Sequence, residues 1–270
     1  MNNIVADLHI HSTFSDGKLS VEEICKLLKM KGIKYFSITD HDSIRSFEEG
    51  RKNSENLGLV YFPGIEFSTV HQKRQVHILF YGKNVEGITK ELEIRKNDRF
   101  LRILKMVELL KDFNINIDKE DLFFEAKDSE SIGRPHLARV MVKRGFVSSL
   151  KEAFEKYIGD DKPCYVPKKE FSVRETVDMI HKYEGIAVLA HPYENNVVEF
   201  IDEIIGIGID GIEVFSPKNN QFNIDFLYDK AFKNSLIVTG GSDFHGDGEY
   251  QKYGLNESNF EQFYNLWRNL

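Results

Sequence analysis

The segment IVADLHIHSTFSDG, at residues 4–17, begins as an apolar β-type run and ends in polar and charged side chains. His9 and His11 stand two positions apart, and in an extended strand residues i and i+2 point to the same side. The two imidazoles can therefore face one common ligand. Asp16 follows in a Ser-Asp-Gly sequence, where aspartate is also an ordinary turn residue. Taken alone, this segment is equally compatible with unrelated polar residues at the end of a strand.

Four further segments repeat the pattern of an apolar run that ends in His, Asp or Glu. Helix-type sequence separates them, as in SVEEICKLLKMKG (20–32), where Ser20 and Glu23 predict a capping box and Gly32 the helix end. Strand, helix and strand in alternation are typical of parallel βα units, whose strand ends share one face. We therefore expect the polar residues to converge in space. The four segments are ITDHDS (38–43), GIEFST (64–69), LAHP (189–192) and GSDFHG (241–246).

The middle of the chain differs from the two ends. It is charged and shows few β signals, and RFLRILKMVELLKDF (99–113) has apolar residues at helical spacing. We predict an α/β barrel formed by residues 1–84 and 163–270, with residues 85–162 as a helical insertion subdomain that covers the active site. Within the barrel, helices are expected over residues 43–56 and 173–182.

Composition narrows the class of protein. The chain has 270 residues, 41% of them hydrophobic, and a formal net charge of −7, which gives no argument for nonspecific nucleic-acid binding. Cys25 and Cys164 are too few and too far apart for a disulfide framework and suggest a reducing compartment. No signal peptide and no apolar stretch of roughly 20 residues is apparent. We expect a cytoplasmic protein that does not enter a membrane.

Each candidate ligand also has a purely structural explanation. His41 lies between two aspartates, and Asp42 or Ser43 would cap the following helix. His77 lies in the apolar run QVHILFYG, where a core histidine is the usual reading. The joint arrangement is harder to dismiss, because imidazole and carboxylate ligands without thiolates suit Zn²⁺, Mn²⁺ or Fe²⁺. The nine candidates are too many for one ion: His9, His11, Asp16, His41, Glu66, His77, His191, Asp243 and His245.

Clustered metal ions favour transfer of a phosphoryl group to water. The segments DLHIHSTFSDG, ITDHD, PGIEFS, LAHP and GSDFH together resemble the motifs of the PHP (polymerase and histidinol phosphatase) family, in the family's order and across nearly the whole chain. This resemblance implies a distorted (β/α)7 barrel with three divalent ions (Mn²⁺, Fe²⁺ or Zn²⁺) at a trinuclear site.

The resemblance also implies how the ligands divide. His9, His11, Glu66 and Asp243 would hold one ion, and Glu66 would bridge to a second ion held by His77 and His191. Asp16, His41 and His245 would hold the third. Asp16 stands where some relatives have histidine, which would shift the metal preference toward Mn²⁺ or Fe²⁺.

The segment GRPHLARVMVKRGF (133–146) is similar to the stand-alone nucleotide phosphoesterase branch of the family. In that branch the GRPH residues face the metals, so Arg134 would offer a bidentate fork to a phosphate and His136 a further donor or a proton. The alternative is that Arg134 and Pro135 merely begin a helix. Lys168 and Lys169 would add positive charge nearby, although a solvated loop is the simpler reading. Phe123 and Phe124 are expected in the insertion core rather than as a base-stacking platform.

The leading hypothesis is a metal-dependent phosphoesterase that hydrolyses phosphomonoesters. The expected substrates are nucleotides such as 5′-AMP or nucleoside 3′,5′-bisphosphates. A metal-bridging hydroxide would attack phosphorus, with Asp243, His191 and His136 as the catalytic residues. The alternative is a 5′–3′ exonuclease on short RNA or DNA oligonucleotides. A histidinol-phosphatase-like enzyme, a non-catalytic metal-binding module and a metal-dependent amidohydrolase stay open as weaker readings.

Overall fold

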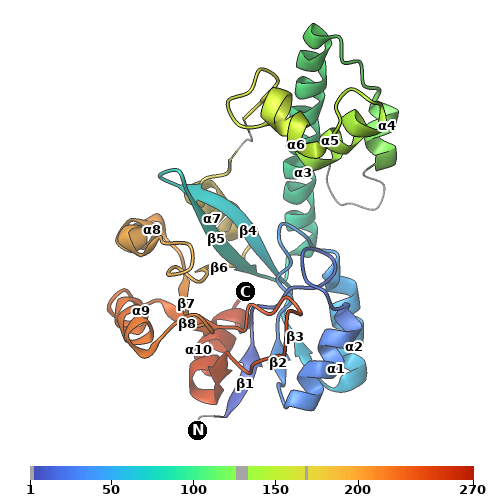
Figure 1. Ribbon diagram of the computed structural model, residues 1–270. Coiled ribbons are helices and arrows are strands. Elements are labelled where there is room, and N and C mark those ends of the chain that lie inside the picture. The colour runs from blue at the N-terminus through green and yellow to red at the C-terminus, as the bar shows by residue number, and fades with distance from the viewer. Residues whose placement is uncertain (1–2, 126–132, 168–169) are drawn as a thin grey trace. The chain divides into compact units, whose positions relative to one another are not determined.

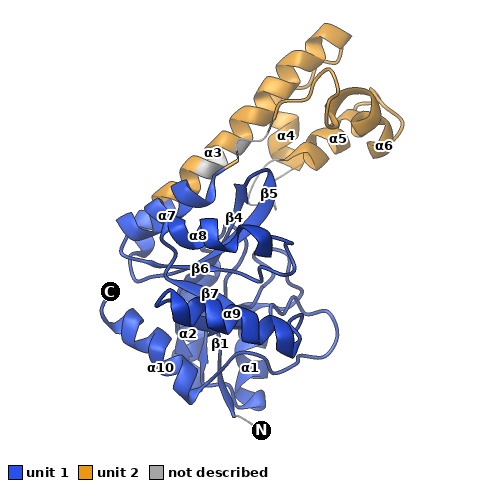
Figure 2. Cartoon of the chain, turned by 90° about the vertical axis from the view of Figure 1, so that its left-hand side faces the viewer, with its two compact units in different colours: residues 1–89, 171–270 blue, residues 90–170 orange. Residues whose placement is uncertain are grey.

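The computed structural model describes residues 3–125, 133–167 and 170–270, and the chain divides into two compact units. Unit 1 comprises residues 1–89 and 171–270, and unit 2 comprises residues 90–170 (Figure 2). The helical insertion predicted from the sequence, residues 85–162, differs from unit 2 by five to eight residues at its two ends. Within the described ranges, no helix is both long and apolar enough to cross a membrane.

Two sheets form the centre of unit 1 (Figure 1). One sheet has the strand order β3-β2-β1-β9, with β1 (Ile4–Asp7), β2 (Tyr35–Phe36), β3 (Val60–Tyr61) and β9 (Leu255–Asn256). The other has the order β4-β5-β6-β7-β8, with β4 (Gly64–His71), β5 (Arg74–Tyr81), β6 (Ile186–Leu189), β7 (Gly211–Phe215) and β8 (Ile237–Gly240).

The mixed α/β prediction is confirmed, but the (β/α)7 barrel is not, because the strands lie in two sheets and neither closes on itself. Strand direction is also mixed. The pairs β1/β2, β2/β3, β6/β7 and β7/β8 are parallel, whereas β1/β9, β4/β5 and β5/β6 are antiparallel. The parallel βα pattern therefore holds at each end of unit 1 and fails around the β4–β5 hairpin.

Backbone hydrogen bonds link the edges of the two sheets at two places. Leu8 N–H donates to the Gly240 carbonyl at 3.2 Å, which joins the end of β1 to β8. Glu66 N–H donates to the Thr39 carbonyl at 3.1 Å, which joins the chain after β2 to β4. The carboxyl ends of β1, β2 and β8 consequently lie beside the first residues of β4.

The helices of unit 1 largely follow their sequence signals. The capping box of Ser20 and Glu23 and the left-handed Gly32 at the helix end are both confirmed. The cap predicted at Asp42 or Ser43 is wrong, because the next helix begins later and its N-cap, Arg45, makes no side-chain capping hydrogen bond. The helices are α1 (Val21–Lys31), α2 (Ser46–Leu57), α7 (Val173–Lys182), α8 (Ile201–Ile207), α9 (Gln221–Lys233) and α10 (Glu257–Arg268), with a short 3₁₀ turn at Val198–Phe200.

All regular elements in the described part of unit 2 are helical, and the unit has a core of its own. Its elements are α3 (Val85–Leu110), which starts in unit 1, the 3₁₀ turn Lys111–Phe113, α4 (Lys119–Glu125), α5 (Arg134–Lys143), α6 (Leu150–Ala153) and the π-helical turn Phe154–Ile158. Apolar residues of α3, α4 and α5, among them Ile103, Leu122 and Leu137, are buried together. The sequence of residues 90–170 therefore buries an apolar cluster without help from the sheets.

Phe123 and Phe124 correct one expectation about this core. Their side chains are 54% and 71% exposed, so neither belongs to the buried cluster of unit 2. The Phe123 ring packs instead against Phe100 of α3, with the ring centroids 5.1 Å apart. On the short helix α4 only Leu122 is buried, which leaves no inward position for its two neighbours.

Candidate metal centre

The first three predicted ligand segments come together in unit 1. His9 and His11 follow β1, and His41 follows β2. An isolated parallel bridge pairs His41 with Glu66, which brings the third residue of β4 to the same edge. The side chains of His9, His11 and Glu66 are almost completely buried, so this edge is an interior site rather than a surface cluster.

The remaining predicted ligands reach the same edge from the second sheet. His191 follows β6, and Asp243 and His245 follow β8. His77 lies in the first half of β5, and it arrives at this edge because β5 runs antiparallel to both of its neighbours. The pairing of Ser68 with His77 places the His77 side chain on the same face as Glu66.

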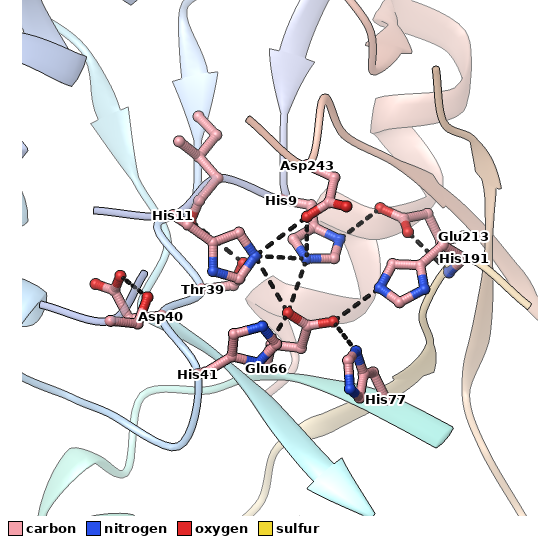
Figure 3. A network of polar contacts seen from close by, with 12 residues as sticks. His9, His11, Thr39, Asp40, His41, Glu66, His77, His191, Glu213 and Asp243 are labelled. Atoms are coloured by element: carbon pink, nitrogen blue, oxygen red, sulfur yellow. Dashed lines mark hydrogen bonds and ion pairs between the residues drawn. The ribbon is translucent and has the colours of Figure 1, made fainter. Parts of the chain in front are cut away.

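The Glu66 carboxylate is the centre of the cluster (Figure 3). Its Oε1 atom lies 2.7 Å from His77 Nδ1 and 2.8 Å from His191 Nε2. Its Oε2 atom lies 3.3 Å from His9 Nε2, 3.1 Å from His11 Nε2 and 3.2 Å from His41 Nδ1. One buried carboxylate thus contacts five imidazoles.

Two more carboxylates complete the arrangement. Asp243 Oδ1 lies 3.2 Å from His11 Nε2 and 3.5 Å from His9 Nε2. Asp16, whose side chain is half exposed, lies 3.4 Å from His245 Nε2 and 3.5 Å from His11 Nδ1. Three groups have donor atoms within 4.8 Å of one another: His9, His11, Glu66 and Asp243; His11, Asp16, His41 and His245; and His41, Glu66 and His77.

The donor atoms fit divalent metal ions. The buried Nδ1 atoms of His11, His41 and His77 have no hydrogen-bond partner, although His41 and His77 each have a Glu66 oxygen close by. His9 Nε2 and His11 Nε2 lie 3.2 Å apart, and both face the same two carboxylates. Buried nitrogens and oxygens that converge without satisfying one another are what imidazole and carboxylate ligands offer to a metal.

The ionisation of the cluster reflects the same crowding. Burial works to raise the pKa of Glu66, but the charge of His9 and contacts with His11, His191 and His77 outweigh it and hold that pKa well below its usual value. Burial works to lower the pKa of His11, and its contacts with Asp243 and Glu66 raise it to about 9. The acids are therefore charged, and the proton of an imidazole such as His11 balances part of their charge. A bound metal cation would displace such protons.

Two of the predicted ligands adopt unusual backbone conformations. His191 has φ 24° and Asp243 has φ 50°, in the region that side-chain-bearing residues seldom occupy. Such a conformation costs on the order of 1–3 kcal/mol and persists only where surrounding structure imposes it. Both residues lie within three positions after the ends of β6 and β8, so the strain lies where the chain leaves these strands.

Glu213 is a member of the site that the sequence analysis missed. It is 1% exposed in β7, its Oε1 lies 2.9 Å from His9 Nδ1, and its Oε2 accepts the His191 N–H at 2.9 Å. Because Glu213 accepts a hydrogen bond from His9 Nδ1–H, the His9 Nε2 atom is the one presented to Glu66. The available signal was a single glutamate inside the apolar strand segment GIEVF.

Two other buried acids hold the loops that carry the ligands. Asp40 accepts hydrogen bonds from Ser12 N–H at 2.8 Å and from Ser15 Oγ at 2.7 Å, which fixes the turn before Asp16. Asp7 accepts from Ser242 N–H at 2.9 Å and from Tyr250 Oη at 2.7 Å, which fixes the loop before Asp243. Burial raises the pKa of Asp7 to about 6.

A cavity of about 310 Å³ opens beside Asp243 and His245. Its walls come from the loops after β7 and β8, and they include Pro217, Ser242 and Gln251. The rim carries Asp247 and Glu249, which pair with Lys18 and Lys31. Unit 1 therefore offers room next to the ligand cluster for a small polar molecule.

Arg134 and His136 lie in unit 2, at the start of α5. Arg134 Nη1 donates to Asp160 Oδ1 at 2.8 Å, and His136 Nδ1 accepts the Gly133 N–H at 3.1 Å. The neutral His136 ring thus carries its proton on Nε2. Arg134 and Pro135 also begin the helix, as the alternative interpretation required. Lys168 and Lys169 fall outside the described residues.

The comparison with protein families agrees with the motifs. Residues 7–130 match the PHP domain model. The matched part of this chain is similar to a PHP domain. A 5′-3′ exoribonuclease from Haemophilus influenzae is 29% identical over 97% of both chains, and a 3′,5′-nucleoside bisphosphate phosphatase from Chromobacterium violaceum is 28% identical over 90% of this chain and 88% of the relative.

Solved structures extend the PHP comparison to the fold. A protein from Bifidobacterium adolescentis, assigned as a metal-dependent phosphoesterase, superposes with a TM-score of 0.68 at 28% identity. The match covers 97% of this chain and 96% of that one. The likeness therefore includes the PHP motifs and continues beyond the segment that the family model matches.

Proposed function

We propose that this protein is a metal-dependent phosphoesterase that hydrolyses phosphomonoesters of nucleotides, such as 5′-AMP or nucleoside 3′,5′-bisphosphates. The observation that carries the proposal is the Glu66 carboxylate, which five imidazoles contact in the interior of unit 1. Relatives named as phosphatases and exoribonucleases, which align over nearly the whole chain, support the same reaction class.

We infer three divalent ions, with Mn²⁺, Fe²⁺ and Zn²⁺ as the candidates. Glu66 would serve two of them, with His9, His11 and Asp243 on one side and His77 and His191 on the other. Asp16, His41 and His245 would hold the third, where the oxygen of Asp16 favours Mn²⁺ or Fe²⁺ over Zn²⁺. When bound, such ions supply Lewis acidity toward phosphate oxygens and lower the pKa of water.

The side chains of the protein would bind the phosphate and manage its protons. Arg134 offers two parallel N–H donors to phosphate oxygens, in the geometry that guanidinium groups favour. His136 would offer its Nε2–H as a hydrogen-bond donor to an oxygen of the phosphate or of the leaving group, because its Nδ1 atom already accepts the Gly133 N–H. Glu213 keeps His9 Nε2 and the His191 backbone in place while the substrate binds.

Three finer features belong to the same proposal. The two sheets of unit 1, linked at β8/β1 and β2/β4, would act as one distorted (β/α)7 barrel. Unit 2, residues 90–170, would be a helical insertion in the sequence of that barrel. We also infer a cytoplasmic protein, because Cys25 and Cys164 are both free and buried, as expected in a reducing compartment.

The test is a substrate panel with the Mn²⁺-loaded protein, comprising p-nitrophenyl phosphate, 5′-AMP and adenosine 3′,5′-bisphosphate. We expect release of phosphate that is lost in His9→Ala and in Asp243→Ala. His181→Ala is the matched control, because His181 lies on α7 and pairs with Asp210 outside the cluster. Absence of turnover on every substrate, or turnover that survives both cluster variants, would overturn the proposal.

Exonuclease action on short oligonucleotides is the second candidate. It is favoured by the charge and surface of unit 2, where residues 90–170 hold 18 Lys and Arg against 16 Asp and Glu. The exposed rings of Phe123 and Phe124 add surfaces on which bases can stack. A ladder assay on 5′-phosphorylated oligonucleotides separates stepwise shortening from hydrolysis of mononucleotides alone.

A further inference from the structure

Gln75 lies next to His77 on strand β5. The two residues are two positions apart, so their side chains project from the same face of the sheet, which is also the face of Glu66. Gln75 Nε2 lies 3.1 Å from His77 Nε2, and His77 Nδ1 lies 2.7 Å from Glu66 Oε1 (Figure 3). The imidazole of His77 is therefore held between a buried carboxylate of the candidate metal centre and the amide of an exposed glutamine.

Two other imidazoles of the cluster have a partner that can only accept a hydrogen bond. His9 Nδ1 lies 2.9 Å from Glu213 Oε1, and His245 Nδ1 lies 2.8 Å from the Asp243 carbonyl oxygen. An ionised carboxylate or a carbonyl keeps the ring proton on that nitrogen, so the lone pair stays on Nε2, which faces the acids of the cluster. These two rings are thus fixed in one tautomer.

The amide of Gln75 differs because it carries both a donor and an acceptor. Two nitrogen atoms form a hydrogen bond only when one of them donates a proton, and the amide nitrogen is a donor only. In its contact with Gln75, His77 Nε2 therefore accepts, and the ring proton lies on Nδ1. That tautomer leaves no lone pair on the nitrogen that faces Glu66.

The surroundings of His77 Nδ1 favour the opposite tautomer. Its 2.7 Å contact with Glu66 Oε1 lacks the geometry of a hydrogen bond, and this buried nitrogen has no hydrogen-bond partner among the described residues. A proton on Nδ1 is thus unsatisfied, whereas a lone pair there could be shared with a cation that Glu66 also contacts. The ring proton would then lie on Nε2, and Gln75 could accept it only through Oε1.

We propose that Gln75 is a positioning residue whose amide turns over when His77 binds a metal ion. With its nitrogen toward the ring, the amide matches the metal-free tautomer of His77. With its oxygen toward the ring, it accepts Nε2–H and leaves the Nδ1 lone pair free for the ion. The proposal rests on the metal centre of the proposed function and is independent of the substrate.

This role distinguishes His77 from the other ligands. His9 and His245 keep their ring proton on the same nitrogen with and without metal, whereas the proton of His77 changes place. Because Gln75 stabilises both tautomers, it favours metal binding less than a carboxylate would, which stabilises only the metal-binding one. Gln75 therefore lowers the affinity for the ion that His77 shares with Glu66.

The first test reads the position of the ring proton. ¹⁵N NMR of the histidine side chains, at mildly alkaline pH, compares the metal-free full-length chain with the chain loaded with diamagnetic Zn²⁺, and His77→Gln identifies the His77 signals. We expect the His77 proton on Nδ1 without metal and on Nε2 with it, while His9 keeps its proton on Nδ1. Gln75→Glu should place the His77 proton on Nε2 even without metal. The same tautomer of His77 in both states of the wild type, or a metal-free ring protonated on both nitrogens, would overturn the proposal.

Metal affinity provides a test with two signs. In competition with a chromogenic chelator, Gln75→Glu should bind its most weakly held Zn²⁺ about tenfold more tightly, the lower end of the effect of groups that orient a ligand, because water competes at an exposed residue. Gln75→Met offers neither donor nor acceptor and should bind that ion less tightly than wild type. Gln72→Glu and Gln72→Met are the matched controls, because Gln72 lies on the same hairpin and donates to Glu203 outside the cluster. Equal gains in Gln75→Glu and Gln72→Glu would indicate a general effect of charge and would contradict the role of Gln75.

The outcomes separate this proposal from the proposed function, because none of these measurements uses a phosphoester. If the tautomer and the affinity change as expected but no substrate is hydrolysed, the role of Gln75 stands and the phosphoesterase proposal fails. If hydrolysis is normal and Gln75→Glu leaves both the His77 proton and the Zn²⁺ affinity as in the wild type, the role of Gln75 is wrong. A chain that binds no Zn²⁺ would overturn both.

Discussion

Unit 1 and unit 2 carry the same number of basic residues and differ in their acids. Each holds 18 Lys and Arg, but unit 1 has 27 Asp and Glu where unit 2 has 16. In unit 1 the acids Glu66 and Glu213 are buried against histidines. In unit 2 the partly buried Arg102 donates to the Val166 carbonyl, and Asp160, whose charge also acts on Arg102, pairs with Arg134. The buried acids of unit 1 thus suit it to cations, whereas unit 2 carries a small excess of basic residues.

The largest expected effect tests the cation half of this comparison. Glu66→Gln removes the charge that five imidazoles contact, so metal content should fall and kcat should drop on the order of 10³-fold. Metal analysis and steady-state kinetics measure the two effects. Glu203→Gln, which changes an exposed glutamate paired with His71, is the control. Full metal occupancy in Glu66→Gln would refute the assignment.

A cavity in the core of unit 2 tests whether the two halves are separable. Leu137 is fully buried among apolar residues of α3 to α6, and Leu137→Ala should destabilise unit 2 by about 2–5 kcal/mol. Denaturant titration followed by proteolysis should locate the loss in residues 90–170. Metal stoichiometry should stay that of the wild type, and a parallel loss of metal would show that the units are not independent.

Removal of metal should destabilise unit 1 and leave unit 2 largely unchanged. Ions that bind only the folded state at about 100 times their Kd add about 2.7 kcal/mol of stability. Chelation should therefore lower hydrogen-exchange protection around His9, Glu66 and Asp243 in unit 1. Amides of α5 in unit 2 serve as the internal control and should change little. Uniform deprotection of both units would contradict the expectation.

A smaller effect is expected from the residue that orients His9. Glu213→Gln keeps an oxygen for the His191 N–H and loses the charge that holds the His9 Nδ1 proton. Metal affinity should fall about 10–100-fold, as is usual for groups that orient a ligand. Competition with a chromogenic chelator measures it, and Glu194→Gln, an exposed change, is the control. Unchanged affinity would reduce Glu213 to a packing role.

The smallest expected effect is a dependence of stability on pH in the metal-free chain. Burial opposes protonation of His11, but contacts with Asp243 and Glu66 raise its pKa to about 9, above the usual histidine value of 6.5. A raised pKa stabilises the folded state below the unfolded value, and this contribution is lost as pH rises from 6.5 to about 9. Urea titrations in chelator across that range should show unit 1 weakening. His11→Gln should flatten the profile, and a rise in stability would contradict the assignment.

Much of the fold and site could be predicted from local patterns. The capping box at Ser20 and the bounds of α7 follow from side chains that act on neighbouring backbone. His9 and His11, like Asp243 and His245, could be paired because alternation along a strand is a local property. The order of the strands could not be predicted in this way, since it depends on contacts such as that of β1 with β9 across the whole chain.

The sequence by itself determined most of the histidines and carboxylates that gather in the cluster, because a histidine or a carboxylate after an apolar run can be recognised without a structure. Only the tertiary structure decided how they meet. The reversal of β5 brings His77 to Glu66, and the pairing of β7 with β8 brings Glu213 beneath His9. The physical reason is that charge balance in an interior depends on distances between segments, and those distances exist only after the chain has folded.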